Sequence, residues 1–343
     1  MERRSSSNGW RRRPAPGAWM PWAVAVLATA AVLVTAPPDA AGAGARSVFA
    51  DGQPRIMAPA APGGGWDQTS REMQAALRDL VGRSEVYNVA GAGGTIGLSQ
   101  FVRFGDDPTQ LMTTGLIMLG AVEANGSEFS LEDATPLLRL TTDYQVVVVP
   151  ADSPLRSTAD LEAEMRADLP AVSIAGGSAG GVEQIMAGLM AKAAGGDPAQ
   201  ISYVAHSGGG EALTTLLSGR ATIGIFGLSE IVPQIEAGTV RALAVSSPQR
   251  LPAIPDVPTL RAGGLDVELE NWRGVVAPRA ITDDEERALE EILVKMTRTP
   301  AWQDALARRG WGDATLAGPE FEEFVRTEQA RVSQVLTELG VSS

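Results

Sequence analysis

The chain of 343 residues contains no cysteine, one histidine (His206) and two lysines (Lys192 and Lys295). The lack of cysteine excludes disulfides, a thiol nucleophile and a lipid anchor attached through cysteine. With one histidine, a transition-metal site would need mostly carboxylates. No motif with metal-ligand spacing is present, so we expect no metal and no cofactor. Neither lysine follows a glycine-rich loop as G-x-x-x-x-G-K-[ST], which excludes a P-loop.

Basic residues are fewer than acidic ones. The chain has 28 Lys and Arg and 41 Asp and Glu, which gives a formal net charge of −13. A protein that binds nucleic acid needs a basic face toward the phosphates, so we expect no nucleic-acid partner. Hydrophobic residues make up 44% of the chain and charged residues 20%, as in ordinary globular proteins. The length is sufficient for two domains with sizeable cores.

The first 45 residues predict a signal peptide. Five arginines within the first 13 residues precede an apolar run over 22–36, and A-x-A sites follow at 41–43 and 43–45. A run of about 15 apolar residues is short for a membrane span. We therefore expect export to the periplasm or another extracytoplasmic space, with a membrane tether through an uncleaved signal as the alternative.

After the signal, strand and helix patterns alternate. The predicted strands are 54–59, 84–89, 138–150, 171–175, 201–205, 221–227 and 240–246. Helical spacing of apolar residues between them predicts parallel sheets with covered faces, the α/β class. The proline-rich stretch 247–260 is predicted to cross between domains. A strand within 267–278 follows, and then a helical C-terminal part, with a capping box at Thr282 and Glu285 and a last helix after Pro319.

Four segments share the order strand, glycine loop, helix start: PGGGWD (62–67), AGAGGTIG (90–97), GGSAGG (176–181) and HSGGGEAL (206–213). Glycine allows the backbone to approach a ligand closely, and the first turn of a helix offers unpaired N–H groups with a partial positive charge. Such an end binds an anion without a basic side chain. A plain strand-to-helix turn explains any one of these loops, but four in one chain favour an anion-binding protein.

Ser178 lies in a G-x-S-x-G pattern, which is typical of the nucleophile elbow of serine hydrolases. A catalytic triad also needs a general base, and His206 is the one histidine available. The two residues are 28 positions apart, whereas α/β hydrolases place their histidine after several further strands. A secreted serine esterase that uses Ser178 and His206 is therefore the alternative function, and we expect the protein not to be an enzyme. From the sequence, a position of His206 on the surface and a position facing a ligand are equally expected.

The four glycine loops and the later NWRGVVAP (271–278) occur in an order and spacing that resemble the TctC/Bug extracytoplasmic receptors of tripartite tricarboxylate transporters. The resemblance covers 47–343. It implies a two-lobed α/β fold of the periplasmic-binding type, a Venus flytrap, in which two strands cross between the lobes. Lobe 1 would be 47–149 plus 265–343, and lobe 2 would be 150–264. QVVVVP (145–150) and a strand within 267–278 would be the crossing strands.

The resemblance further implies a receptor that captures a small di- or tricarboxylate between its lobes and delivers it to integral membrane subunits of the transporter. The receptor would be a monomer. Loop N–H groups, hydroxyls and water hold the ligands of this family. Asp67 would cap its helix, or bind a ligand hydroxyl or water. Carried over by motif, the ligand-binding residues are Gly64, Gly65, Trp66, Asp67 and Thr95 on one side and Ser178, Ala179, Gly180, Gly181, Ser207, Gly208 and Gly209 on the other.

Overall fold

The computed structural model describes residues 48–49, 52–206 and 208–341. The predicted signal peptide (1–45) and Ser207 lie outside these residues. None of the helices within the described part of the chain is both long and apolar enough to span a membrane.

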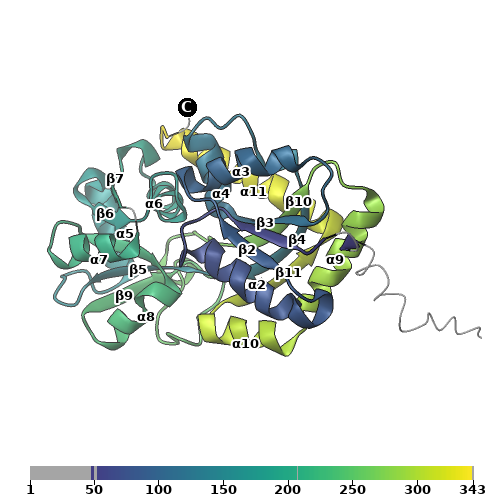
Figure 1. Ribbon diagram of the computed structural model, residues 1–343. Coiled ribbons are helices and arrows are strands. Elements are labelled where there is room, and N and C mark those ends of the chain that lie inside the picture. The colour runs from purple at the N-terminus through teal and green to yellow at the C-terminus, as the bar shows by residue number, and fades with distance from the viewer. Residues whose placement is uncertain (1–47, 50–51, 207, 342–343) are drawn as a thin grey trace, which may run out of the picture. The chain divides into compact units, whose positions relative to one another are not determined.

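The first sheet has six strands in the order β11-β4-β10-β3-β1-β2 and combines early and late parts of the chain, drawn in purple to blue and in green to yellow (Figure 1). Its strands are β1 (Arg55–Ala58), β2 (Glu85–Asn88), β3 (Gln110–Gly115), β4 (Ala134–Thr142), β10 (Arg273–Pro278) and β11 (Gly312–Ala317). Its helices are α2 (Gly65–Val81), α3 (Thr95–Phe101), α4 (Leu116–Ala124), α9 (Asp283–Thr297), α10 (Pro300–Arg309) and α11 (Gly318–Glu338). β1 pairs in parallel with β2 and β3, whereas β10 pairs antiparallel with both β3 and β4.

The second sheet has five strands in the order β7-β6-β8-β5-β9. Its strands are β5 (Gln145–Pro150), β6 (Ser173–Gly176), β7 (Ser202–Ala205), β8 (Ile223–Gly227) and β9 (Val240–Val245). The helices between them are α5 (Thr158–Ala167), α6 (Val182–Ala193), α7 (Gly209–Leu217) and α8 (Leu228–Glu236). The predicted α/β class is thus confirmed, although the sheets are mixed because β5 runs antiparallel to β8 and β9.

The chain passes between the two sheets twice, at neighbouring places. The single strand predicted over 138–150 is divided into β4 and β5, which belong to different sheets. The return passage leads into β10. Asp143 and Asn271 join the two passages through backbone hydrogen bonds in both directions, at 3.2 and 2.8 Å.

The prediction that 247–260 crosses between domains is wrong. The backbone N–H of Leu260 donates to the carbonyl of Val245 at 2.9 Å, and Thr259 pairs with the same strand residue. Ile254 is buried in the core beneath β9. The prolines therefore shape a loop that stays with the second sheet, and the passage follows ten residues later.

The C-terminal helices agree with the sequence prediction. Thr282 and Glu285 form the capping box of α9, and α11 buries an apolar face that includes Phe321 and Val332. Fully buried Trp272 packs edge-on against Phe321, with ring centroids 5.9 Å apart. The aromatic residues of α11 thus belong to the core, as their spacing predicts.

Candidate functional site

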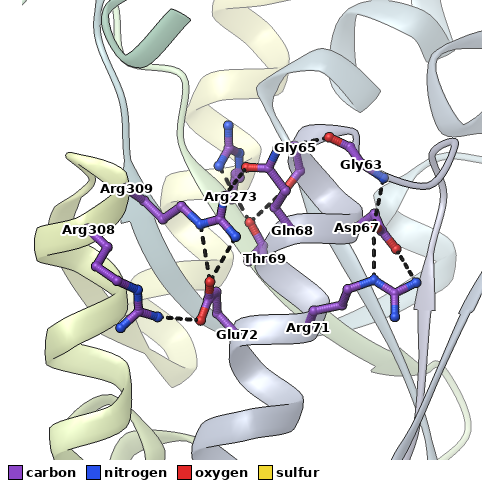
Figure 2. Close-up of polar contacts among 10 residues, drawn as sticks. All are labelled: Gly63, Gly65, Asp67, Gln68, Thr69, Arg71, Glu72, Arg273, Arg308 and Arg309. Atoms are coloured by element: carbon purple, nitrogen blue, oxygen red, sulfur yellow. Dashed lines mark hydrogen bonds and ion pairs between the residues drawn. The ribbon is translucent and has the colours of Figure 1, made fainter.

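Loop 1 (59–64) joins β1 to α2 and is held from inside by Asp67, the third residue of the helix. The Asp67 carboxylate is 2% exposed and accepts from the backbone N–H of Gly63 at 2.7 Å, from Arg71 Nε at 3.0 Å and from Asn88 Nδ2 at 2.8 Å. Figure 2 shows the side chain turned back toward Gly63 and Arg71. Asp67 therefore fixes the shape of the loop, in agreement with the capping role considered for it.

The charge on Asp67 is stabilised by these contacts. Burial by itself raises the pKa of the carboxyl group, but the hydrogen bonds from Arg71, Gly63 and Asn88 outweigh burial and lower the pKa below its ordinary value. The helix is secured further along by Glu72, which pairs with Arg308 and Arg309 of α10 at 3.0 and 2.9 Å (Figure 2).

Loop 2 (89–94), between β2 and α3, lies against Trp66, the second residue of α2. A side chain at Gly94 would place its Cβ 2.7 Å from the indole ring of Trp66, and the left-handed φ of +96° at this position also favours glycine. The Thr95 hydroxyl donates to the carbonyl of Ala92 at 2.9 Å, within the same loop. Thr95 is buried. Its hydroxyl thus supports loop 2 from within.

A cavity of about 260 Å³ opens between loops 1 and 2. Its lining residues are Pro59, Ala60, Gly65, Trp66, Gly91, Ala92, Gly93, Gly94, Ile117 and Arg273. Of the residues predicted for this side, Gly65 and Trp66 line the cavity. Gly64, Asp67 and Thr95 are not part of its wall.

Arg273, the first residue of β10, is a cavity residue that the sequence analysis did not single out. Its Nη1 donates to Thr69 Oγ1 at 3.5 Å, and its guanidinium lies 4.9 Å from the ring centre of Trp311. The side chain is close to Gly65, where a Cβ would lie 3.0 Å from Nη2 (Figure 2). Burial lowers the pKa of Arg273, and the nearby carboxylates Asp143 and Glu230 oppose that effect.

Loop 3 (177–181) precedes α6, and two of its five backbone N–H groups are satisfied locally. The N–H of Gly180 donates to Gln184 Oε1 at 2.7 Å, and the N–H of Gly181 donates to the carbonyl of Ser178 at 3.0 Å. Ser178 and Ala179 are exposed. Gly180 is buried against α4, since a Cβ at Gly120 would lie 2.3 Å from the Gly180 carbonyl oxygen.

His206 connects loop 3 to loop 4 (206–208), which precedes α7. Its Nδ1 lies 3.1 Å from the carbonyl oxygen of Gly176 and its Nε2 lies 2.8 Å from Thr215 Oγ1. A carbonyl only accepts, so Nδ1 carries a proton and donates it to Gly176. Both ring nitrogens are therefore engaged away from Ser178, which is not the arrangement that the esterase alternative needs.

Three carboxylates lie on the second-sheet side of Arg273: Asp143, Glu183 and Glu230. Asp143 is 5% exposed and accepts from the backbone N–H of Tyr144 at 2.9 Å. Burial, reinforced by the charges of Glu230 and Asp143, raises the pKa of Glu183 to about 7. Burial and Asp143 also raise the pKa of Glu230. The pKa values of all three carboxyl groups are thus raised, so each loses its proton at a higher pH than an exposed carboxyl group would.

The predicted site residues lie in two separate pairs of neighbouring loops. Loop 2 meets the start of α2, where Gly94 lies against Trp66. Loops 3 and 4 meet where the His206 N–H donates to the Gly177 carbonyl at 3.1 Å. Gly208 is exposed, and Gly209 begins α7 against Glu230.

Comparison with known proteins gives one consistent relationship. Residues 69–341 match the family model of the tripartite tricarboxylate transporter family receptor, TctC. A UPF0065 protein from the TAR-I ttuE-ttuC′ intergenic region of Agrobacterium vitis is 28% identical over 324 residues, which cover 92% of this chain and 91% of the relative.

Solved structures agree in fold. Rpa4515 of R. palustris with adipate has a TM-score of 0.71 and 23% identity, over 84% of this chain and 98% of that protein. MatC of Rhodopseudomonas palustris with bound malate has a TM-score of 0.68 and 23% identity, over 83% of this chain and 98% of that protein. The match confirms the prediction of a two-lobed periplasmic-binding fold.

Proposed function

Because this chain belongs to the tripartite tricarboxylate transporter receptor family, we propose that it is an extracytoplasmic receptor that captures a small carboxylate and delivers it to membrane subunits of a transporter. The observation that supports this most directly is Arg273, a cation without a carboxylate at ion-pair distance among the described residues, in the wall of a cavity between two glycine loops. A guanidinium binds a carboxylate through two parallel hydrogen bonds.

The ligand would lie between two lobes with bounds close to the predicted 47–149 plus 265–343 and 150–264. β5 (Gln145–Pro150) goes with the second lobe, because it pairs with β8 and β9. Contact residues on the first lobe would be Gly65, Trp66 and Arg273, with Gly64, Asp67 and Thr95 shaping the loops behind them. On the second lobe, the exposed residues Ser178, Ala179 and Gly208 are the nearest to open solvent among those predicted. Ligand contacts with both lobes would favour a closed arrangement.

Export through the N-terminal signal would place the receptor in the periplasm as a monomer. The family resemblance implies a di- or tricarboxylate as ligand, and the adipate and malate in Rpa4515 and MatC support trying dicarboxylates first. No covalent step is needed for this function.

A thermal-shift panel of citrate, succinate, malate, glutamate and aromatic acids tests the proposal. A ligand at 100 times its Kd stabilises the folded state by about 2.7 kcal/mol. The diamide of succinic acid, which has a similar size and no charge, should give no shift. If no carboxylate in the panel raises Tm, the proposal is wrong.

A second assay addresses the esterase alternative. We expect no turnover of short acyl esters above the rate of a Ser178→Ala variant. Hydrolysis that disappears in that variant would replace the receptor function with an enzymatic one.

A further inference from the structure

The cavity beside Arg273 combines one charged group with an otherwise apolar set of side chains. The guanidinium of Arg273 and the indole N–H of Trp66 are the polar side-chain groups of its described lining residues. The other lining residues are glycine, alanine, proline and isoleucine, so none of them has a side-chain oxygen. A ligand group in this cavity would therefore meet side-chain donors but no side-chain acceptor from the described residues.

Backbone acceptors in the same wall are partly occupied. The carbonyl of Ala60 accepts from Asn88 Nδ2 at 3.0 Å. The carbonyl of Ala92 accepts both from Thr95 Oγ1, at 2.9 Å, and from Asn125 Nδ2, at 3.1 Å. A carbonyl oxygen has two lone pairs, so the acceptor capacity of Ala92 is used. A ligand hydroxyl, which needs an acceptor for its proton, would compete with these contacts.

Donors for a carboxylate are present, in contrast. Arg273 has one long hydrogen bond, at 3.5 Å to Thr69. A guanidinium carries five N–H donors, so most of those of Arg273 have no protein acceptor among the described residues. A carboxylate accepts hydrogen bonds and donates none, so it satisfies these donors without needing an acceptor itself.

Apolar carbon is also exposed next to the cavity. Ile96, in the first turn of α3, is 46% exposed and is one of three large hydrophobic residues exposed in the described part of the chain. It lies against loop 2, since a Cβ at Gly91 would be 2.6 Å from Ile96 Cδ1. Ile117 is half-buried and lines the cavity itself. A hydrocarbon group of a ligand would remove such surface from water.

We propose that the ligand carries plain hydrocarbon, without hydroxyl groups, beside the carboxylate that binds Arg273, and that the protein prefers such acids to hydroxy acids of the same skeleton. The hydrocarbon would pack against Trp66 and Ile117. This inference rests on the proposed receptor function and narrows its ligand class, for one carboxylate group or several. A citrate-like ligand, which the family resemblance suggests, does not meet this condition.

Isothermal titration of the purified full chain with matched acids tests the inference. Succinate is paired with tartrate, adipate with galactarate and tricarballylate with citrate, so that the members of a pair differ in hydroxyl groups alone. Tartrate and galactarate carry a hydroxyl beside each carboxylate, so either end would bring one next to Arg273. In the pairs that bind, we expect the acid without hydroxyl groups to bind about tenfold more tightly or better, because a buried hydroxyl without an acceptor is unfavourable.

Two variants locate the effect. Ile117→Thr adds a hydroxyl to the cavity wall and should reduce the preference about fivefold, since it gives a ligand hydroxyl a partner. Arg273→Gln should weaken both members of a pair. Leu217→Thr, at the 47% exposed last residue of α7, is the control for the change to threonine and should leave both affinities unchanged. Unchanged Tm values in the absence of ligand establish that the variants fold.

Equal or tighter binding of the hydroxylated acids overturns the inference and leaves the receptor function intact, and so does a wild-type preference in Ile117→Thr. If none of the six acids binds, the thermal-shift panel decides. An aromatic acid without a hydroxyl group as the ligand supports the inference, whereas malate or glutamate alone overturns it. If no carboxylate of any kind binds, the proposed function fails as well.

Discussion

Replacing Glu183 by glutamine tests the electrostatics of the second-sheet side directly. Glutamine has nearly the same shape as a protonated glutamate but carries no charge at any pH. The pKa of Glu183 is raised from 4.5 to about 7, first by burial and then by the charges of Glu230 and Asp143. Between these two pH values the folded protein holds a proton on Glu183 that the unfolded chain has lost.

The sign and size of the effect follow from this difference. Where the folded state binds more protons, the free energy of unfolding falls as pH rises, so the wild type loses stability between pH 4.5 and 7. The shift from 4.5 to about 7, at 1.36 kcal/mol per pKa unit, corresponds to at most about 3 kcal/mol. Glu183→Gln avoids this loss. It should match the wild type near pH 4.5 and exceed it by up to about 3 kcal/mol at pH 8.

Urea unfolding of both proteins at pH 5, 6, 7 and 8, without ligand, measures the difference. Glu164→Gln, at an exposed position of α5, is the control and should leave the pH dependence of the wild type unchanged. A difference between Glu183→Gln and the wild type that stays constant across this range would refute the reasoning, because burial of a titrating carboxyl group could not produce it.

Three further changes test individual contacts. Asp67→Asn should cost about 1–3 kcal/mol at pH 7 in denaturant unfolding. Because the pKa of Asp67 is lowered, that cost should shrink as pH falls below 4, and a cost that grows in acid would contradict it. Gly120→Ala should lower stability by about 1–3 kcal/mol through overpacking against loop 3, whereas Gly210→Ala, with open space around its Cβ, should not lower Tm. Lys192→Met breaks an exposed ion pair with Glu338, at 2.6 Å, and should cost less than about 1 kcal/mol, with a smaller cost in high salt; a larger loss would assign a structural role to the pair.

Local patterns in the sequence predicted most of the elements. The alternation of apolar runs with helical spacing located seven strands, and the capping box at Thr282 located the start of α9. The pattern did not show where one strand ends and the next begins within 138–150, because both strands are mostly buried and no Gly or Pro separates them. Which strands pair antiparallel depends on contacts distant in the sequence, such as that of β10 with β4.

The candidate site was predicted in part. Glycine loops indicate where backbone groups can approach a ligand, and this pattern led to the prediction of Gly65 and Trp66. Arg273 was not found, because it lies more than 200 residues from loop 1 and in a strand that is not followed by a glycine-rich loop. Its signal was present in NWRGVVAP, as a charged residue at the start of an apolar strand. The acidic side of the site was also not found, since Glu183 and Glu230 resemble ordinary first-turn residues of helices.

The hydrogen bonds between Asp143 and Asn271 have a consequence for movement. They make the two passages between the sheets into one narrow ribbon, so a bend in one passage must be matched by a bend in the other. Two independent tethers would permit twisting and sliding as well, whereas a bonded pair leaves essentially a single axis of rotation. Since Asp143 belongs to this axis and interacts electrostatically with Arg273, a carboxylate bound to the guanidinium would alter the electrostatic environment of the pivot itself.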